Sequence, residues 1–333
     1  NLTLGKALSL TSGSITSTGG TLTFTGGLTL GTAGALDVTG STLSVSQDLD
    51  LSSGTFSSDN SSMLDLQAAI KLTSNNQVLF GDVHFNGNVL TLGSASTHLK
   101  VNDNLTLAGI AMETGAGSLT LSGALALTDN ASLNSSGGTI TLQSGGSAST
   151  GSVVSLPDTI LVTHDYLSFY GSTLTAKNTT FTTNGFALAV DSGSILEVEG
   201  TQNISGLFSD NTSTLRLTAD TVLNNNAWFN VNKLDLADFA LTLDDNMSRL
   251  SVAQLVTLDA AGEKILTGAA DLALNGGISA TAGTLSSTGG TLSLPGGATL
   301  ATGSSFSTSN TTLNLGGSLA VADTWTSTST SVS

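Results

Sequence analysis

The sequence predicts an all-β protein, a three-sided parallel β-solenoid with about 20 to 21 residues in each coil. Two observations lead to this fold class. Aliphatic and aromatic residues recur in pairs two positions apart, as in Leu2/Leu4, Leu8/Leu10 and Leu22/Phe24, which is the period of a strand with one buried face. Successive pairs begin about six to eight residues apart, so that three short strands complete one coil.

The links between these pairs are Gly-Gly, Ser-Gly, Thr-Gly or Asn-containing segments, which tolerate tight corners and positive φ angles. Leu8, Leu28, Leu49 and Ile70 stand at intervals of 20, 21 and 21 residues, one coil apart. A β-sandwich or meander would place its turns about 8 to 12 residues apart, which is wider than the spacing here. At this period the chain makes roughly 16 coils, each pairing with the next.

The composition agrees with an all-β solenoid. Charged residues make up only 10% of the 333 residues and hydrophobic residues 39%, with 39 Gly and 2 Pro. The Lys, Arg and Glu that surface helices need are scarce, whereas Ser, Thr, Asn and Gly are abundant. The mean hydropathy of +0.25 argues against disorder, because disordered segments are poor in hydrophobic residues.

The charge and the residue types exclude several classes of partner. The formal net charge is −16 and no block of Lys or Arg occurs, so we expect no nucleic-acid binding and no docking on anionic lipid. No apolar run approaches the roughly 20 residues of a membrane span, and we expect no direct membrane insertion. With no Cys, the chain has neither a disulfide framework nor a thiolate metal site.

We expect one continuous solenoid fragment over residues 1–333, with two departures from the regular coil. Residues 155–171 contain one of the two prolines and both tyrosines, which predicts a widened coil or a protruding loop. Residues 224–267 have a higher charge density and few glycines, and the leucine spacing around 249–259 predicts a short helix. Residues 326–333 lack leucine pairs and are expected to form a linker-like tail.

The chain offers few groups for catalysis, and we expect no enzymatic activity. Its three histidines are isolated, and no hydrolase, nucleotide-binding or metalloprotease motif is present. The alternative is a polysaccharide-active β-helix enzyme with carboxylates converging in one groove. Its candidate pairs are Asp235/Asp238, Asp244/Asp245 and the two pairs with a spacing of two residues, Asp48/Asp50 and Glu197/Glu199. Because residues two apart in a strand point the same way, both pairs are expected instead to form outward ladders.

Calcium is the one ion that the sequence suggests, and no other cofactor is expected. Asp235, Asp238, Asp244 and Asp245 lie within eleven residues of one another, and carboxylate oxygens are the ligands that Ca²⁺ prefers. The loops of EF-hands and of calcium-binding β-rolls are both missing from the sequence.

A longer repeat accompanies the short one. The segment that begins at Ser14 aligns without gaps to the segment at Thr284, an offset of 270 residues, and Leu43 falls on Leu313. This is the pattern expected if the parent chain repeats a unit of about 270 residues.

The Leu-x-Leu pairs, the Gly-Gly and Ser-Gly corners, the Ser/Thr/Asn-rich coat and the missing Cys resemble the solenoid regions of large bacterial adhesins. These include filamentous-haemagglutinin-type exoproteins and autotransporter passenger domains. The resemblance covers nearly the whole chain and rests on the composition and the spacing of residue types rather than on a signature motif. It implies a right-handed parallel β-helix, secretion and a structural or adhesive role at the cell surface, and it carries over no binding residue.

We therefore expect a stiff spacer and contact surface within an extracellular fibre. The contact residues expected from the irregular regions are Tyr166, Tyr170 and Trp228. The expected partners are cell-surface or matrix ligands, carbohydrate among them. An alternative is a filament subunit that self-associates end to end, because an uncapped solenoid exposes its last coil.

Overall fold

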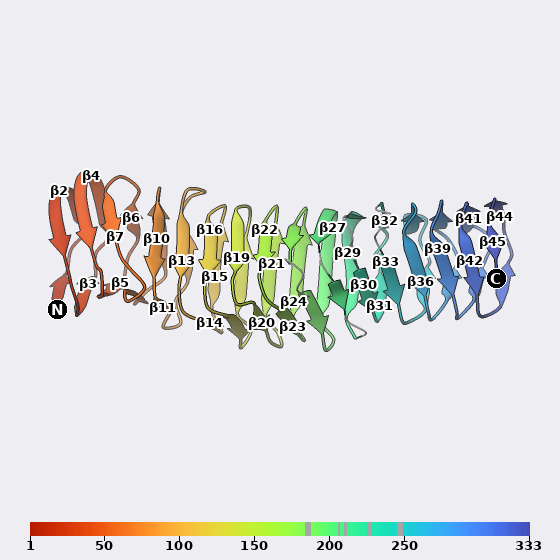
Figure 1. Ribbon diagram of the computed structural model, residues 1–333, viewed down its shortest axis with the longest axis horizontal. Coiled ribbons are helices and arrows are strands. Elements are labelled where there is room, and N and C mark those ends of the chain that lie inside the picture. The colour runs from red at the N-terminus through yellow and green to blue at the C-terminus, as the bar shows by residue number, and fades with distance from the viewer. Residues whose placement is uncertain (184–187, 206, 210–211, 225–227, 245–248) are drawn as a thin grey trace. The chain divides into compact units, whose positions relative to one another are not determined.

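The structure, a computed structural model, confirms a parallel β-solenoid of about 15 turns with roughly 21 residues per turn. It describes residues 1–183, 188–205, 207–209, 212–224, 228–244 and 249–333, without the side chains of 204–205, 207–209 and 228–229. Over these residues the chain forms strands and turns and no helix (Figure 1). Accordingly, no helix long and apolar enough to span a membrane occurs in the described residues.

The chain divides into two compact units, Asn1–Tyr166 and Leu167–Ser333. In each unit the strands follow three faces, which we number in chain order within that unit. Strands β2, β4, β27 and β29 are long enough to turn the corner from the second face to the third.

In the first unit, the first face contains β1 (Leu2–Leu4), β3 (Thr21–Phe24), β5 (Thr42–Val45), β8 (Met63–Leu66), β11 (Asp82–His84), β14 (Leu105–Ala108), β17 (Leu125–Thr128) and β20 (Gly146–Ala148). The second face contains the beginnings of β2 (Leu8–Thr16) and β4 (Leu28–Asp37), then β6 (Leu49–Leu51), β9 (Ile70–Ser74), β12 (Leu90–Leu92), β15 (Ala111–Gly115), β18 (Ser132–Ser135) and β21 (Val153–Pro157). The third face contains the ends of β2 and β4, then β7 (Thr55–Ser57), β10 (Gln77–Phe80), β13 (His98–Val101), β16 (Ser118–Leu121), β19 (Thr139–Leu142) and β22 (Ile160–Thr163).

In the second unit, the first face contains β23 (Leu167–Tyr170), β26 (Leu188–Asp191), β28 (Leu207–Ser209), β30 (Trp228–Val231), β33 (Arg249–Val252), β36 (Asp271–Leu274), β39 (Thr291–Leu294), β42 (Thr312–Leu315) and β45 (Ser331–Val332). The second face contains β24 (Thr173–Lys177), the beginnings of β27 (Ile195–Ser205) and β29 (Thr214–Asn224), then β31 (Lys233–Asp235), β34 (Val256–Leu258), β37 (Ile278–Ala280), β40 (Ala298–Leu300) and β43 (Leu319–Val321). The third face contains β25 (Thr180–Thr182), the ends of β27 and β29, then β32 (Ala240–Leu243), β35 (Lys264–Thr267), β38 (Thr284–Ser287), β41 (Ser305–Ser309) and β44 (Trp325–Thr328).

Strands on a face pair in parallel with the strand one coil away. Leu8 lies beside Leu28 and Leu28 beside Leu49, as the intervals of the sequence predict. The third expected pair is wrong, because Leu49 lies beside Leu72 rather than Ile70. This slip of two residues keeps every inward side chain inward, since the side-chain period of a strand is two.

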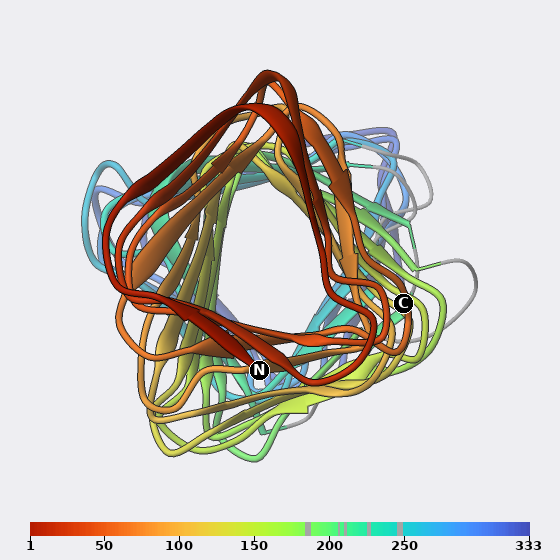
Figure 2. The ribbon, with the colours of Figure 1, turned by 90° about the vertical axis from the view of Figure 1, so that its left-hand side faces the viewer.

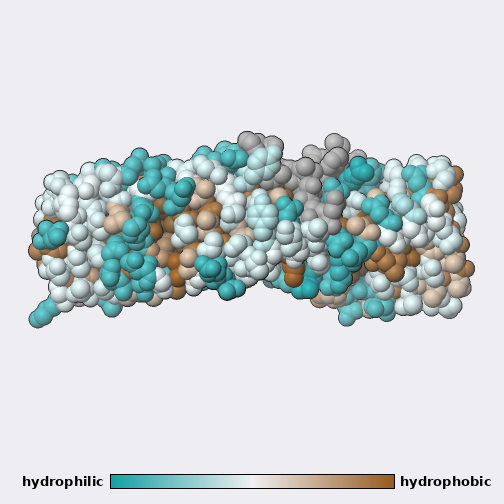
Figure 3. Space-filling model, turned by 90° about the horizontal axis from the view of Figure 1, so that it is seen from below, coloured by the Kyte–Doolittle hydropathy of each residue, from teal (hydrophilic) through white to brown (hydrophobic). Residues whose placement is uncertain are grey.

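The leucine pairs fill the interior. Inward residues such as Leu43, Leu99 and Leu119 are fully buried, whereas the residues between them are outward and mostly polar. In the first unit the red and orange coils outline a three-cornered section around this core (Figure 2). The surface in view in Figure 3 is mostly hydrophilic or neutral, with smaller hydrophobic areas.

Small and polar residues make the corners. Gly34 lies where a Cβ atom would collide with the carbonyl oxygen of Leu10, one coil earlier. At the corner between the second and third faces, buried hydroxyl groups satisfy the backbone that turns inward. Thr97 Oγ1 accepts the N–H of Ser74 (3.0 Å), and Thr159 Oγ1 donates to the carbonyl oxygen of Pro157 (2.9 Å).

Three local expectations differ from the structure. The helix expected around 249–259 is wrong: these residues form β33 and β34, because the leucines that suggested helical spacing face the interior from two strands or lie at the corner between them. Residues 326–333 continue the coil instead of forming a linker-like tail, since β44 and β45 pair with β41 and β42 through backbone groups that need no leucine. The widened coil or protruding loop expected within 155–171 does not occur at β21 and β22, which keep their regular pairing with β18 and β19.

We predict that Leu30→Ala lowers the free energy of unfolding by about 2 to 5 kcal/mol, because Leu30 is buried between neighbouring coils and the substitution leaves a cavity. Urea unfolding followed by circular dichroism measures the change. The matched control is Thr29→Ala on the exposed side of the same strand, expected to change stability by less than about 0.5 kcal/mol. Equal losses in the two variants would contradict the buried ladder.

A second prediction concerns the corner at Asp59. Hydrogen bonds from the Ser61 and Ser62 hydroxyls and from the N–H groups of Gly40 and Ser61 lower the pKa of Asp59 from 3.8 to about 2. A lowered pKa in the folded state means that the stabilisation is complete above about pH 4 and is lost as the pH falls toward 2. Asp59→Asn should therefore flatten the fall of the urea midpoint between pH 5 and pH 2. An unchanged pH profile would show that this carboxylate does not contribute.

Candidate functional sites: two interruptions of the sheets

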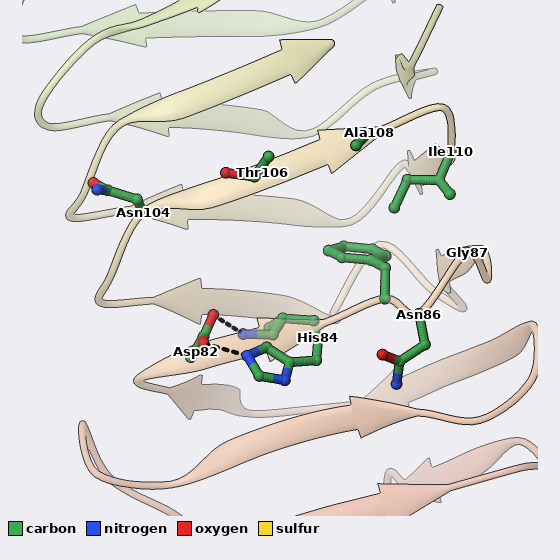
Figure 4. A pocket seen from close by; sticks show the side chains of 10 residues that line it. Asp82, His84, Asn86, Gly87, Asn104, Thr106, Ala108 and Ile110 are labelled. Carbon is green, nitrogen blue, oxygen red and sulfur yellow. Dashed lines mark hydrogen bonds and ion pairs between the residues drawn. The ribbon is translucent and has the colours of Figure 1, made fainter. Parts of the chain in front are cut away.

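The first candidate site lies where the sheet on the first face of the first unit is interrupted. β11 pairs with β8, and β14 pairs with β17, but β11 and β14 belong to different sheets. A hollow of about 420 Å³ lies between them (Figure 4). We call it the β11–β14 cleft, and its lining residues are Asp82–Gly87, Asn104, Thr106, Ala108 and Ile110.

Local contacts shape β11 and the turn that follows it. The carboxylate of Asp82 accepts the N–H of Val83 (2.7 Å), so a side chain takes up a backbone donor. Asn86 and Gly87 then adopt φ angles of 49° and 77°, which turn the chain, and Phe85 is buried behind them. Asn and Gly are the residues that enter this left-handed region at least cost.

The opposite lip of the cleft presents unpaired backbone. Leu105 N–H donates to Ala124 and Gly109 N–H to Thr128, so these residues and Leu107 between them direct their backbone toward β17. Successive residues of a strand direct their N–H and C=O groups to opposite sides. Thr106 and Ala108 therefore direct theirs into the cleft, where both residues are exposed.

An acid and a base meet at the cleft. His84 Nε2 lies 2.8 Å from Asp82 Oδ2, and both side chains project from β11 on the same side (Figure 4). Asn86 Nδ2 donates to Asp65 Oδ1 (2.7 Å) on the preceding coil. The β11–β14 cleft thus offers a carboxylate–imidazole pair, an amide and strand-edge backbone groups, all of which can bind a polar or extended ligand.

The second candidate site is an interruption of the same kind in the second unit. β31 pairs with β29, and β34 pairs with β37, but β31 and β34 lie in different sheets. A hollow of about 530 Å³ lies between them. We call it the β31–β34 cleft, and it is lined by 233–238, Leu255, Thr257, Asp259 and Glu263.

Both lips of the β31–β34 cleft carry strand-edge backbone. Val256 N–H donates to Gly277 and Thr281 N–H to Leu258, so Val256 and Leu258 are paired with β37. Thr257 between them directs its backbone into the cleft. On the other lip, Lys233 N–H donates to Ser213, which leaves the backbone of Leu234 directed toward the cleft.

The coil that closes this cleft is longer than its neighbours. Leu241 lies beside Ile265, 24 residues later, where other coils take about 21. Glu263 is buried at the added corner, and its Oε2 accepts the N–H groups of Asp259 (2.6 Å) and Ala260 (3.2 Å). Ala237 and Asp238 have φ angles of 49° and 75°, an uncommon pair of left-handed residues.

The four aspartates expected to bind calcium are only partly brought together. Asp235 and Asp238 both line the β31–β34 cleft, but Asp244 follows β32 and does not line it, and Asp245 lies outside the described residues. Asp235 Oδ2 is paired with Arg216 Nε (3.4 Å) and Lys233 Nζ (3.8 Å). No group of three or more His, Asp or Glu side chains that could hold a metal occurs in the described part of the chain, and calcium binding stays a prediction.

The outward carboxylate pair Glu197/Glu199 does form a surface ladder. Arg216 Nη1 lies 3.2 Å from Glu197 Oε1, and Lys177 Nζ lies 2.7 Å from Glu199 Oε1. Arg216 thereby bridges Glu197 and Asp235 on the strands to either side. Cross-strand charge pairs of this kind compensate the acidic surface locally.

The three aromatic residues expected at a contact surface fall in separate places. Tyr166 is 59% exposed in the turn that ends the first unit. Tyr170 is 45% exposed at the end of β23 in the second unit. The backbone of Trp228 begins β30, and its side chain lies outside the described structure. A contact role for these residues stays a prediction.

Sequence reasoning missed the β11–β14 cleft. Asp82 and His84 are two residues apart in a strand, which places their side chains on one side, and this spacing was a usable signal. The missing partner strand leaves no local mark, because it depends on which residues lie one coil away.

No protein-family model, curated protein or solved structure matches this chain.

We predict that amide hydrogen exchange alternates along β14. The N–H groups of Thr106 and Ala108 should exchange at least about 100-fold faster than those of Leu107 and Gly109, which the β17 ladder protects. Ser118–Leu121 of β16, paired on both sides, supplies the internal control. Uniform protection along β14 would show that the cleft is closed in solution.

Proposed function

We propose that the chain is a segment of an extracellular fibre at a bacterial surface, where it acts as a stiff spacer and presents contact surfaces on its sides. The observation that supports this most is the repeated coil: apart from the two clefts, described strands pair with those one coil away, and successive coils bury their own aliphatic residues. Such a design lengthens without needing a new core.

The side surfaces suit a role outside the cell. Outward positions are occupied mainly by Ser, Thr, Asn and Asp, and the net charge of −16 opposes unspecific association between copies. The resemblance to adhesin solenoids in the strand pairs and corners points the same way. The proposed role is non-catalytic, with the two clefts as places where a partner can bind.

The spacer role can be tested by display. The chain would be fused between a cell-surface anchor and a small adhesive domain, and the matched control would be a Gly/Ser linker of equal length. We expect the chain to support at least about ten-fold more adhesion under flow, because a flexible linker of this length collapses toward the surface. Equal adhesion through the linker would overturn the spacer role.

The contact role needs a separate measurement. Beads coated with the purified chain would be passed over immobilised matrix proteins and glycans, with albumin-coated beads as the control. Retention on at least one surface supports adhesion, whereas retention equal to albumin on all of them contradicts it. Sedimentation of the same preparation distinguishes the alternative, since polymers that grow with concentration would indicate a filament subunit.

A further inference from the structure

We propose that a trough on the second face of the first unit binds a neutral, extended oligosaccharide. This deepens the proposed function and rests on it, because it names the ligand class of one contact surface. The trough is a hollow of about 450 Å³ that crosses β2, β4, β6 and β9. We call it the β2–β9 trough, and its lining residues are 7–9, 27–29, 48–50, Lys71 and Thr73.

The pairing of the strands gives the trough a floor and two parallel rows of side chains. The floor follows the backbone of the leucines that pair across the four coils, Leu8, Leu28, Leu49 and Leu72. The residues before and after each leucine point outward together, because side chains alternate along a strand. The first row is Ala7, Gly27, Asp48 and Lys71, and the second row is Ser9, Thr29, Asp50 and Thr73. The two rows lie about 6.6 Å apart, which is two residues along each strand.

Small residues open the hollow above this floor. Among the described atoms beyond its chain neighbours, a Cβ atom added to Gly27 would have only the carbonyl oxygen of Asp48 within 4 Å, at 3.5 Å. The volume of the trough lies within the range of roughly 300 to 1,000 Å³ that small-molecule sites have. Its four strands, about 4.8 Å apart, extend over about 14 Å, and an extended oligosaccharide advances by a similar step for each sugar, so that about three sugars span the trough.

Both aspartates of the trough are held by one carboxylate oxygen and leave the other free. Asp48 Oδ1 accepts the N–H of Lys71 (2.7 Å), and Asp50 Oδ1 accepts the N–H of Ser52 (3.0 Å). Within the described structure, Oδ2 of Asp48 and Oδ2 of Asp50 accept no hydrogen bond from the protein. The trough thus presents two oriented carboxylate oxygens that a ligand can use.

The hydroxyl groups of the trough are free as well. The side chains of Ser9, Thr29 and Thr73 make no hydrogen bond to the part of the chain that the structure describes. Elsewhere in this unit, outward polar groups bind one another, as where Asp65 accepts the hydroxyl of Ser44 (3.0 Å). The polar groups of the β2–β9 trough are therefore available to a ligand.

The pattern of donors and acceptors favours a neutral ligand with many hydroxyl groups. A carboxylate only accepts hydrogen bonds, whereas a hydroxyl group both donates and accepts them. Sugar hydroxyls can therefore donate to Asp48 and Asp50 and also exchange hydrogen bonds with the row of hydroxyl groups. The two carboxylates would repel an anion, and Lys71 beside Asp48 reduces the attraction for a cation. The C–H face of a sugar ring can lie over the bare backbone at Gly27.

The first test uses the complete chain and fluorescein-labelled tetrasaccharides. The neutral probes are built from glucose, mannose, galactose or N-acetylglucosamine. The charged controls of equal length are built from glucosamine, which is cationic, and from galacturonate, which is anionic. We expect saturable binding of at least one neutral probe by fluorescence anisotropy, with a Kd below about 1 mM. Both charged controls should bind at least about ten-fold more weakly than that probe.

A filled trough tests where the probe binds. Gly27→Gln adds a side chain above the floor without a clash, and it should weaken binding at least about ten-fold. The matched control is Gly268→Gln in the second unit, where an added Cβ atom would lie 3.6 Å from the carbonyl oxygen of Leu243. Neither glycine has a positive φ angle, so both variants should keep the circular dichroism spectrum of the unaltered chain. The control should bind within about two-fold of the unaltered chain.

Deletion of one hydroxyl group tests the polar contact. Thr29→Val keeps the shape of the side chain and removes its hydroxyl, and it should weaken binding about three-fold or more, the effect of roughly one hydrogen bond. The matched control is Thr299→Val, at the exposed middle position of β40 on the second face of the second unit. It should change binding less than about two-fold.

The proposal is overturned if no neutral probe binds saturably, or if a charged probe binds as tightly as the best neutral one. It is also overturned if Gly27→Gln leaves binding unchanged, or if a control variant weakens binding as much as its partner in the trough. The comparison of probes uses the unaltered protein, so a misfolded variant cannot imitate success. Failure here would leave the spacer role intact, because display under flow uses a separate adhesive domain.

Discussion

The parallel ladder between successive coils is the constraint on which the rest of the structure depends. Each strand must supply hydrogen-bond partners and an inward side chain to the strand about 21 residues later. Where the coil length permits this, as from Leu2 to Leu22 to Leu43, the leucines stack and the faces are regular. Where one strand fails to meet its successor, a cleft opens with strand-edge backbone on its lip. The regular faces and the clefts that can bind a partner therefore both depend on whether a strand pairs with the strand one coil away.

The corners are where backbone N–H and C=O groups of this fold risk being buried without a hydrogen-bond partner. A three-sided coil must turn its backbone inward three times, and a buried carbonyl or N–H without a partner costs about 1 to 3 kcal/mol. Hydroxyl groups meet this need in both units, as at Thr97 and Thr159 in the first and at Thr221 and Thr311 in the second. In the second unit Gln202 and Glu263 meet it with longer side chains. The longer side chain of Glu263 accompanies a wider corner, which is the corner beside the β31–β34 cleft. A change in corner chemistry thus coincides with a change in coil length.

The fold class followed from the sequence because its signal is local and repeated. The spacing within pairs such as Leu22/Phe24 and Leu64/Leu66 indicates a strand with one buried face, whichever strand it pairs with. The register slip at Leu49 and the two clefts did not follow, since they depend on which residues lie one coil away. The residues that line the β31–β34 cleft differ in the same way in how far the sequence predicts them. Asp235 and Asp238 stood out as neighbours in sequence, whereas Thr257 and Glu263 reach the same cleft only through the fold.

The 270-residue offset in the sequence corresponds to matching corner geometry. Ser41 Oγ donates to the carbonyl oxygen and to Oγ of Ser17, both at 2.9 Å. At the shifted positions, Thr311 Oγ1 donates to the same two atoms of Ser287, at 3.1 and 3.0 Å. The residues just before them, Gly40 and Asn310, both have positive φ angles, of 67° and 52°. Strand periodicity alone would align leucines at many offsets. The corner geometry also recurs at another offset, since Thr159 Oγ1 donates to Ser135 Oγ (2.9 Å) directly after Asp158, whose φ angle is 52°. Similar corners therefore produce this match by themselves, and the repeated unit of about 270 residues stays a prediction.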